Sequence, residues 1–241
     1  MLHDNSLTQN IGKIHTTQMG EERIKRYLSL HIDDVVSWCK EFVAEADIIT
    51  GHGKNWYAYG KGLALTINAR SFTVITAHKI NAGVRVMRPS EYVFLPEFLY
   101  QAIYVPEGKE QPPREIINKP EIMIYIQDFG TQPGDFGLAA ELNGQIIGAA
   151  WTRIIQAYGY LDNVTPELAI SILPEFRSYG TGTKLMKKLF AALRNNGYRQ
   201  TSLSVQKDNP AVRFYQRLGY TMSGERLDQA GHEDYLMIKE F

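Results

Sequence analysis

The sequence predicts an α/β fold of the α+β type, in which a mixed sheet with flanking helices follows a small α+β domain. Asn143-Gly144 stands between two apolar runs, residues 136–142 and 145–151, and this arrangement is the strongest short signal for a β-hairpin. After the hairpin, apolar patterns of strand and helix type alternate to the end of the chain. Strands that alternate with helices after a hairpin indicate a mixed sheet with helices packed on its faces.

The composition is that of a globular protein and argues against several classes of partner. Of 241 residues, 44% are hydrophobic, and 26 Lys and Arg balance 26 Asp and Glu. Without net charge, nothing attracts the whole chain to nucleic acid or membranes, and no run approaches about 18 apolar residues. The single cysteine, Cys39, lies in an apolar helical pattern and fits a core thiol in a reducing compartment. We therefore expect a cytoplasmic protein, compatible with a homodimer, that binds neither nucleic acid nor membrane.

A domain boundary is predicted near Gly83, so that residues 1–82 form a small α+β domain and residues 83–241 form a second domain. In the first domain, Asp33 is placed to cap a helix. The apolar positions of this helix recur every three to four residues, at Val35, Trp38, Cys39, Phe42, Val43 and Ala46. Three strands are predicted after it, over residues 56–59, 63–67 and 72–77.

The other elements of the second domain are predicted from apolar periodicity and from turn residues. The expected helices cover residues 91–104, 120–129, 182–195 and 210–218. The expected strands, besides the hairpin, cover residues 84–87, 167–173, 201–205, 220–223 and 235–239.

One strand-to-helix turn has the composition of a phosphate-binding loop. After the strand that begins at Glu167, the turn contains Arg177, Gly180 and Gly182 and leads directly into a helix. The two glycines let the backbone approach a ligand closely, so that successive N–H groups can converge on a phosphate at the positive end of the helix. Arg177 adds a charged donor for the same anion.

Two widespread glycine loops fit this turn poorly. A P-loop closes with Gly-Lys-Ser or Gly-Lys-Thr, whereas Lys184 here follows Thr183. A dinucleotide-binding loop has a third glycine three residues after the second, where this chain has Leu185. The turn therefore belongs to neither of these two classes.

The turn resembles the pyrophosphate loop of the Gcn5-related N-acetyltransferase (GNAT) family, which reads Arg or Gln, any two residues, Gly, any residue, Gly or Ala. Arg177, Gly180 and Gly182 fill this pattern. In the family a strand precedes the loop and a helix follows it, then another strand. The same order of elements is predicted here.

A second motif of the family is a later helix with Asn-x-x-x-x-x-Tyr that ends in Gly-Phe or Gly-Tyr. Asn209, Tyr215 and Gly219-Tyr220 match it. Helix punctuation alone, with Asn209 as cap, Pro210 in the first turn and Gly219 as stop, explains the ends of this helix. It does not explain why the helix lies one strand after a phosphate loop.

The resemblance covers residues 84–239 and implies a mixed, mostly antiparallel sheet flanked by helices. It implies an N-acetyltransferase that transfers the acetyl group of acetyl-CoA, its co-substrate, to a primary amine by direct attack on the thioester. The acceptor would be a small molecule or a peptide, and no metal is expected. The residues that the resemblance assigns to acetyl-CoA are Ile172 and Leu173, through their backbone groups, and Arg177, Ser178, Tyr179, Gly180, Thr181, Gly182, Thr183 and Asn209.

The resemblance also assigns two catalytic residues. Tyr215 matches the family's usual general acid, and a phenol can protonate a leaving thiol with a reference pKa of about 8.5. The plainer explanation of Tyr215 is a half-buried aromatic on a helix face. Glu167, at the start of the central strand, matches a frequent general base, and its alternative explanation is an exposed Glu at a strand edge. Glu141 and Asp162 are weaker candidates for the base.

A second function stays open, namely an acetyl-CoA-binding sensor or scaffold that has this fold but does not turn over. The intact positions of both motifs favour the enzyme. The acceptor cannot be identified from the sequence, because acceptor specificity is expected in the first two helices and in loops such as residues 155–165, which vary freely.

Residues 11–79 resemble a family of short bacterial proteins of unknown function, and this resemblance implies no activity. His15 and His52 lie in this part of the chain. Neither has a Cys or carboxylate at ligand spacing, so a loop or core histidine is favoured over a metal ligand.

Overall fold

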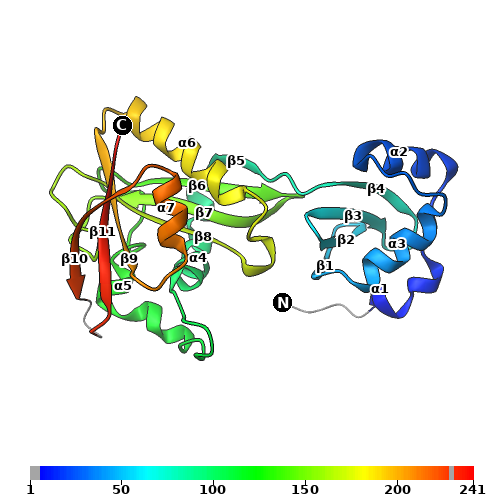
Figure 1. The fold of residues 1–241 in the computed structure, drawn as a ribbon, viewed down its shortest axis with the longest axis horizontal. Coiled ribbons are helices and arrows are strands. Elements are labelled where there is room, and N and C mark those ends of the chain that lie inside the picture. Colours follow the sequence, from blue (N-terminus) through cyan, green and yellow to red (C-terminus); the bar gives the residue numbers. More distant parts are fainter. Residues whose placement is uncertain (1–5, 228–230) are drawn as a thin grey trace. The chain divides into compact units, whose positions relative to one another are not determined.

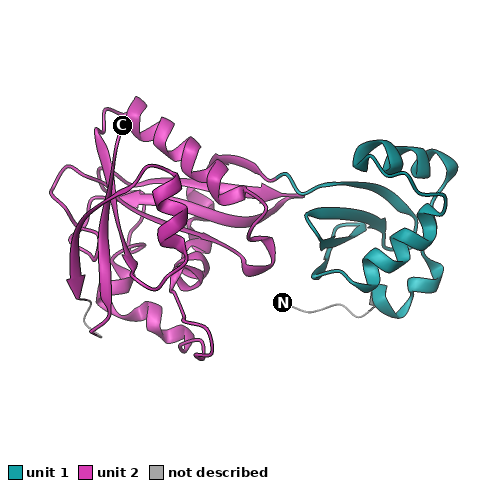
Figure 2. Cartoon of the chain, in the orientation of Figure 1, with its two compact units in different colours: residues 1–81 teal, residues 82–241 magenta. Residues whose placement is uncertain are grey.

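A computed structural model describes residues 6–227 and 231–241 of the chain. The chain divides into two compact units, Met1–Asn81 and Ala82–Phe241, which Figure 2 shows in teal and magenta. Each unit has its own sheet. Every site residue expected from the sequence lies in the second unit.

The first unit is a four-stranded antiparallel sheet with helices packed on it (Figure 1). Its strands lie in sequence order and are β1 (Ile48–His52), β2 (Asn55–Gly60), β3 (Leu63–Asn68) and β4 (Val74–Lys79). The helical elements are α1 (Ser6–Gln9), the 3₁₀ turn η1 (Ile11–Lys13), α2 (Gln18–Leu28) and α3 (Val35–Ala44). Helix α2 packs against β4 and α3 against β2, which confirms the predicted small α+β fold.

The apolar periodicity of α3 is explained by the core of this unit. Val35, Cys39, Phe42 and Val43 are all buried there. Burial raises the pKa of the Cys39 thiol to about 12, so this thiol is protonated at neutral pH and is a poor nucleophile.

Three details of the first unit differ from the sequence prediction. The cap of α3 is Asp34 and not Asp33, because a capping side chain must directly precede the first helical residue. The Asp34 carboxylate accepts from the backbone N–H of Ser37 at 2.8 Å. Sequence patterns also fail to predict β1, which ends in the weak strand formers Gly51-His52, and α2, which contains Gly20.

The second unit is a seven-stranded sheet in the order β10-β11-β9-β8-β7-β6-β5. Its strands are β5 (Gly83–Val86), β6 (Phe136–Leu142), β7 (Gln145–Arg153), β8 (Glu167–Ile172), β9 (Gln200–Gln206), β10 (Thr221–Leu227) and β11 (Glu233–Glu240). Neighbouring strands are antiparallel except β8 and β9, which are parallel. The sheet is therefore mixed and mostly antiparallel, as predicted.

Helices pack on the strands of this sheet. The helical elements are η2 (Pro89–Phe94), α4 (Leu95–Ala102), η3 (Arg114–Asn118), α5 (Pro120–Met123), η4 (Pro174–Phe176), α6 (Thr181–Asn195) and α7 (Ala211–Arg217). Helix α4 packs on β7 and β8, α6 on β5 to β8, and α7 on β9. This arrangement confirms the predicted sheet flanked by helices.

The two helices predicted before the hairpin are shorter than expected. The span 91–104 divides into η2 and α4, because Pro96 has no N–H to donate inside a continuous helix and is tolerated in a first turn. The span 120–129 is α-helical over Pro120–Met123 and continues as turns.

Two side chains of β7 explain why these turns do not continue as a helix. The Arg153 guanidinium donates to the carbonyls of Ile124 and Gln127 at 2.9 and 2.6 Å. The Trp151 indole N–H donates to the Tyr125 carbonyl at 3.1 Å. These carbonyls find their partners on β7, so the segment is held against the sheet and not in a helical ladder.

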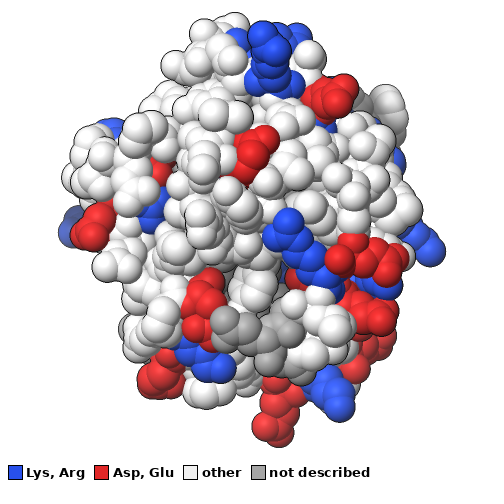
Figure 3. All heavy atoms as spheres, turned by 90° about the vertical axis from the view of Figure 1, so that its left-hand side faces the viewer, with Lys and Arg blue, Asp and Glu red and all other residues white. Residues whose placement is uncertain are grey.

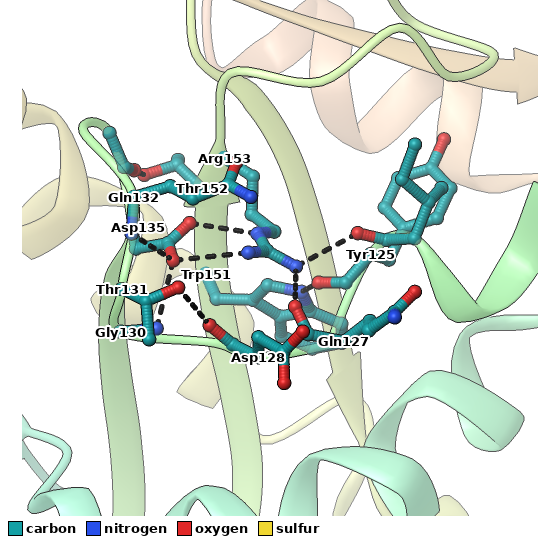
Figure 4. A network of polar contacts seen from close by, with 12 residues as sticks. Tyr125, Gln127, Asp128, Gly130, Thr131, Gln132, Asp135, Trp151, Thr152 and Arg153 are labelled. Atoms are coloured by element: carbon teal, nitrogen blue, oxygen red, sulfur yellow. Dashed lines mark hydrogen bonds and ion pairs between the residues drawn. The ribbon is translucent and has the colours of Figure 1, made fainter.

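Arg153 is itself neutralised inside the protein by Asp135. Both side chains are almost fully buried, with 2% and 1% of their surface exposed. Two hydrogen bonds of 2.8 and 3.1 Å join the guanidinium to the carboxylate, as Figure 4 shows. The second Asp135 oxygen also accepts from the backbone N–H groups of Gly130 and Gln132. We call Arg153, Asp135 and Trp151 the β7 clamp.

The surface carries no extended field of one sign on the side that Figure 3 shows. Lys and Arg are interspersed there with Asp and Glu, and most of that surface is uncharged. In the described ranges, every helix is too short or too polar to cross a membrane.

The β7 clamp leads to the first testable prediction. The Asp135→Ala substitution leaves the buried Arg153 charge without its partner, and we expect it to lower the free energy of unfolding of the second unit by about 3 kcal/mol or more. Urea unfolding followed by circular dichroism measures this loss. The matched control is Glu97→Ala, which removes a more exposed ion pair with Arg114 and should cost about 1 kcal/mol or less. Equal losses in the two variants would contradict a structural role of the clamp.

Candidate active site

The parallel strands β8 and β9 are in register at one pair alone, Glu167 with Ser202. The Pro166 carbonyl accepts from the Ser202 N–H and the Thr201 hydroxyl, which fixes the strands together at this end. Beyond it, no further β8–β9 pair forms within the described strands. Because a sheet in which two neighbours part is open between them, ligands can reach the centre of the unit here.

Two clefts open at this divergence. The first, of about 730 Å³, reaches the turn before α6 and is lined by residues that include Arg177, Gly180 and Gly182, and we call it the loop cleft. The second, of about 670 Å³, includes Glu167 in its lining, and we call it the Glu167 cleft. Both clefts are lined by Tyr104, Ile170, Asn209 and Tyr215, so they meet at these side chains.

The turn before α6 has the geometry of an anion-binding loop. Gly180 has a φ of 78°, a left-handed conformation that glycine adopts without strain, and it directly precedes the first residue of α6. At Gly182 an added Cβ would lie 3.4 Å from the Phe214 ring. The first N–H groups of a helix have no partner within it, and α6 directs them at the loop cleft.

Of the other loop residues, Ser178 and Thr183 line the loop cleft. Tyr179 is half-buried and Thr181 is 2% exposed, and neither is among the described residues that line this cleft. A backbone N–H of either residue can still serve an anion, but the structure brings neither side chain to the cleft.

Arg177 lies at the mouth of the loop cleft and connects three elements. Its Nε donates to the Ile172 carbonyl at 2.9 Å and its Nη2 donates to the Gln101 carbonyl at 3.2 Å. The guanidinium thus ties the turn to the ends of β8 and α4 while keeping its charge near the helix terminus. This is a more structural role than the anion fork expected from the sequence.

The backbone of β8 corrects one expectation. The Leu173 N–H donates to the Ile147 carbonyl of β7, and the Leu173 carbonyl accepts from Phe176, so Leu173 offers no backbone group to the cleft. Antiparallel residues alternate between bonded and non-bonded pairs, so the backbone groups of Ile172 and Ile170 point away from β7. Ile172 and Ile170 therefore form the β8 wall of the cleft, with Ile170 in the place expected of Leu173.

The second sequence motif begins at Asn209, one residue before Pro210, which directly precedes α7, so Asn209 is not in the cap position that helix punctuation predicts but still bonds the first turn. The Asn209 side-chain oxygen accepts from the Ala211 N–H at 2.8 Å, and Gly219 has a φ of 87° after α7. Asn209 also lines both clefts, so its hydrogen bond to the start of α7 and its position at the site coexist.

Tyr215 lies on α7 at the junction of the two clefts. Its ring packs against Phe214 and Tyr220, with centroid distances of 5.4 and 5.7 Å. Burial raises the pKa of the Tyr215 phenol to about 12, so the phenol is protonated at neutral pH and can donate a proton. Its ring packing is that of the half-buried aromatic also considered for it, and its position at both clefts is an additional property.

Glu167 is 3% exposed, so it is not the exposed strand-edge Glu considered as its alternative. Its Oε1 accepts from the Gly159 N–H at 2.7 Å and from the Tyr125 hydroxyl. Within the described part of the chain, its buried Oε2 has no hydrogen-bond partner. The approach of Gly159 requires glycine, because a Cβ there would lie 2.7 Å from Glu167 Oε1.

This environment shifts the pKa of Glu167 towards neutrality. Burial raises it to about 7, although the hydrogen bonds from Tyr125 and Gly159 and the Arg226 charge act in the opposite direction. A carboxyl group with a pKa near the working pH is suited to accept a proton.

The two weaker candidates for the base lie elsewhere. Glu141 is paired with Arg85 at 2.5 Å, and Asp162 accepts from the backbone N–H groups of Val164 and Thr165. Neither is among the described residues that line the two clefts.

Sequence reasoning misses Tyr125, Gly159 and Ile170. Ile170 could be found from strand alternation, since it is two residues before Ile172 and therefore shares its orientation. Tyr125 carries no local signal, because it contacts Glu167 from 42 residues away in sequence. Gly159 lies only eight residues before Glu167, but it belongs to a loop whose path no periodic pattern predicts.

Comparison with known proteins identifies the family of each part. The family model described as "Acetyltransferase (GNAT) family" matches residues 99–220, and the model described as "Protein of unknown function (DUF3781)" matches residues 8–78. Both agree with the resemblances found in the sequence.

Individual relatives are acetyltransferases by name. The chain is 30% identical over 145 residues to the 5-NmdU N-acetyltransferase of Pseudomonas phage PaMx11, covering 58% of this chain and 99% of that protein. It is 25% identical over 111 residues to the mycothiol acetyltransferase of Pseudarthrobacter chlorophenolicus, covering 46% of this chain and 34% of that protein. The chain thus spans about a third of the length of the mycothiol acetyltransferase.

Solved structures share the fold. An acetyltransferase of the GNAT family from Streptococcus pneumoniae superposes with a TM-score of 0.50 at 22% identity, covering 67% of this chain and 99% of that one. A putative acetyltransferase from Acinetobacter baylyi ADP1 gives a TM-score of 0.51 at 16% identity, covering 67% and 95%. Because the family model spans half of the sequence and the fold agrees with it, the chain belongs to the acetyltransferase (GNAT) family.

Proposed function

We propose that the second unit transfers the acetyl group of acetyl-CoA to a primary amine, by direct attack of the amine on the thioester. The observation that carries this proposal is the position of Tyr215, which lines both the loop cleft and the Glu167 cleft where β8 and β9 part. Two substrates, one in each cleft, would meet at this side chain, which is the proximity that a transfer reaction needs.

The residues of the loop cleft fit acetyl-CoA. The open N-terminus of α6 and the left-handed Gly180 suit a pyrophosphate, and Ser178, Gly182 and Thr183 would lie beside it. The backbone groups of Ile170 and the Ile172 N–H would pair with the pantetheine arm, since the Ile172 carbonyl already accepts from Arg177, and Asn209 would lie near the end of the arm. Acetyl-CoA supplies the activated acyl group, and the chain supplies orientation and proton transfer.

Glu167 is suited to accept a proton and Tyr215 to donate one. Glu167, with a pKa of about 7, would accept a proton from the attacking amine through its unpartnered Oε2, directly or through water. Tyr215, with a pKa of about 12, would donate a proton to the sulfur as the C–S bond breaks. Together they would transfer one proton from Tyr215 to the leaving sulfur and one proton from the attacking amine to Glu167.

The acceptor is proposed as a small-molecule or peptide amine. The named relatives are a 5-NmdU N-acetyltransferase and a mycothiol acetyltransferase, and two such different names support no single acceptor. Residues 83–241 are proposed as the acetyltransferase domain and residues 1–82 as a separate domain of unknown role. We place this activity in the cytoplasm, where the buried Cys39 thiol would stay reduced.

The first functional prediction separates an enzyme from an acetyl-CoA sensor or scaffold. Isothermal titration should show acetyl-CoA binding in either case, whereas an enzyme also releases free coenzyme A when a suitable amine is present. A thiol-release screen over polyamines, amino acids, aminoglycosides, peptide N-termini and 5-NmdU measures this. Binding without release across the panel would favour the sensor.

The second functional prediction concerns Tyr215 as the general acid. We expect Tyr215→Phe to lower kcat by about 10²-fold or more, because the thiolate would leave without a positioned proton donor. The matched control is Tyr198→Phe, which makes the same chemical change after the end of α6 and outside both clefts. If Tyr215→Phe stays within about twofold of the parent, the acid is a different group.

The third functional prediction concerns Glu167 as the general base and the pH dependence of kcat/KM. Glu167 must be deprotonated to act, so kcat/KM of the parent should rise as the pH increases through about 7 and then level off. Glu167→Gln removes the titrating group and should both lower kcat/KM and abolish this rise. An unchanged pH profile would exclude Glu167 as the base. Glu141→Gln serves as control and should leave the profile in place.

A further inference from the structure

Tyr125 lines the Glu167 cleft and is held there by its backbone. Its carbonyl accepts from the Trp151 indole, and the carbonyls of Ile124 and Gln127 on either side accept from Arg153. Figure 4 shows the Arg153 guanidinium between the Asp135 carboxylate and this segment. The β7 clamp therefore fixes the place from which the Tyr125 side chain extends.

From this place the Tyr125 hydroxyl donates to Glu167 Oε1. Oε1 receives a second hydrogen bond from the Gly159 N–H, while Oε2 is buried and has no partner in the described part of the chain. The two carboxylate oxygens are thus unequal. Oε1 is anchored by two donors, and Oε2 keeps its lone pairs for a proton.

We propose that Tyr125 is a positioning residue for Glu167, whose hydroxyl anchors Oε1 and thereby leaves Oε2 as the oxygen that takes the proton from the acceptor amine. This inference rests on the proposed function of Glu167 as the base. It assigns Tyr125 no contact with either substrate.

The hydroxyl also stabilises the charged form of the carboxylate. Burial raises the pKa of Glu167. Among the groups that lower this pKa, the Tyr125 hydroxyl has the largest effect, followed by the Gly159 N–H and the Arg226 charge. Arg226 approaches from β10 and donates to the Tyr158 and Tyr160 carbonyls. Other charged or titratable groups that face this cleft are Tyr104, Tyr158, Lys109, Lys119, Glu110, Glu121, His232, Asp234 and Tyr215.

Tyr125 does not itself exchange protons in this scheme. Burial and the nearby Glu167 charge raise the pKa of its phenol well above the usual value, so it stays protonated across the working pH range. It can therefore act as a constant hydrogen-bond donor to a group that titrates.

The test is the pH profile of kcat/KM in Tyr125→Phe, with the best amine of the acceptor screen. Loss of the hydroxyl should move the rise of the profile upward by about one pH unit, so that kcat/KM falls about tenfold below pH 7 and much less at pH 9. Tyr160→Phe is the control, because its hydroxyl bonds the Asn163 side chain in the same loop region and it should leave the profile in place.

A second variant keeps the shape of the side chain. Fluorotyrosine placed at position 125 is a stronger hydrogen-bond donor than tyrosine and should move the rise to lower pH. A purely structural role would lower kcat/KM equally at every pH, and this result in Tyr125→Phe, or an unmoved rise in both variants, would overturn the inference.

The Glu167→Gln background separates this inference from the proposed function. There, Tyr125→Phe should change kcat/KM by no more than about twofold, because the titrating partner is absent. If Glu167→Gln keeps the parent profile, the base is wrong and the inference fails with it. If Glu167→Gln abolishes the rise but Tyr125→Phe leaves it in place, the base stands and the positioning role of Tyr125 is wrong.

Discussion

The site depends on the divergence of two parallel strands. Strands β8 and β9 are in register at one pair, and the Pro166 carbonyl, which accepts from both Ser202 and Thr201, holds them at that end. Parallel neighbours normally continue their ladder, so the parting leaves backbone groups of β8 without a strand partner. A ligand that supplies those hydrogen bonds is therefore favoured at the centre of this sheet, and both clefts exist because of the same opening.

A buried carboxylate at this opening requires support that the sheet alone does not give. An unpaired ionised group is costly in a protein interior, and Glu167 is both buried and near neutrality in its pKa. In the described part of the chain, Oε1 of Glu167 accepts two hydrogen bonds and Oε2 accepts none. The anchoring donors come from a loop glycine and from a segment clamped by a buried ion pair, so the hydrogen bonding of Glu167 depends on the β7 clamp as well as on its own neighbours.

How far the sequence predicts this molecule depends on the range of the interaction involved. The Asn143-Gly144 hairpin, the turn before α6 and the ends of α7 follow from neighbouring residues, and the structure has them where the patterns indicate. The segment after α5 has an apolar pattern that indicates a helix. Its backbone carbonyls, however, accept hydrogen bonds from the side chains of Arg153 and Trp151 on β7. The same contacts with β7 hold Tyr125 where its hydroxyl reaches Glu167. Contacts between segments so far apart in sequence leave no spacing to read.

The same distinction bears on how acceptor choice is encoded. The loop cleft contains the end of β8 and the first turn of the 15-residue α6, which ladder hydrogen bonds fix, together with residues after α4 and at the start of α7. The Glu167 cleft also has strand residues in its lining, from β8 and β9, but unlike the loop cleft it extends along η3 and α5 and reaches His232 and Asp234 at the start of β11. Segments held by individual side-chain contacts can change with few substitutions while the strands stay in place. In the proposed reaction, recognition of the amine would therefore vary on this frame without disturbing the proposed acetyl-CoA side, provided that Tyr125 and the β7 clamp keep Glu167 in position.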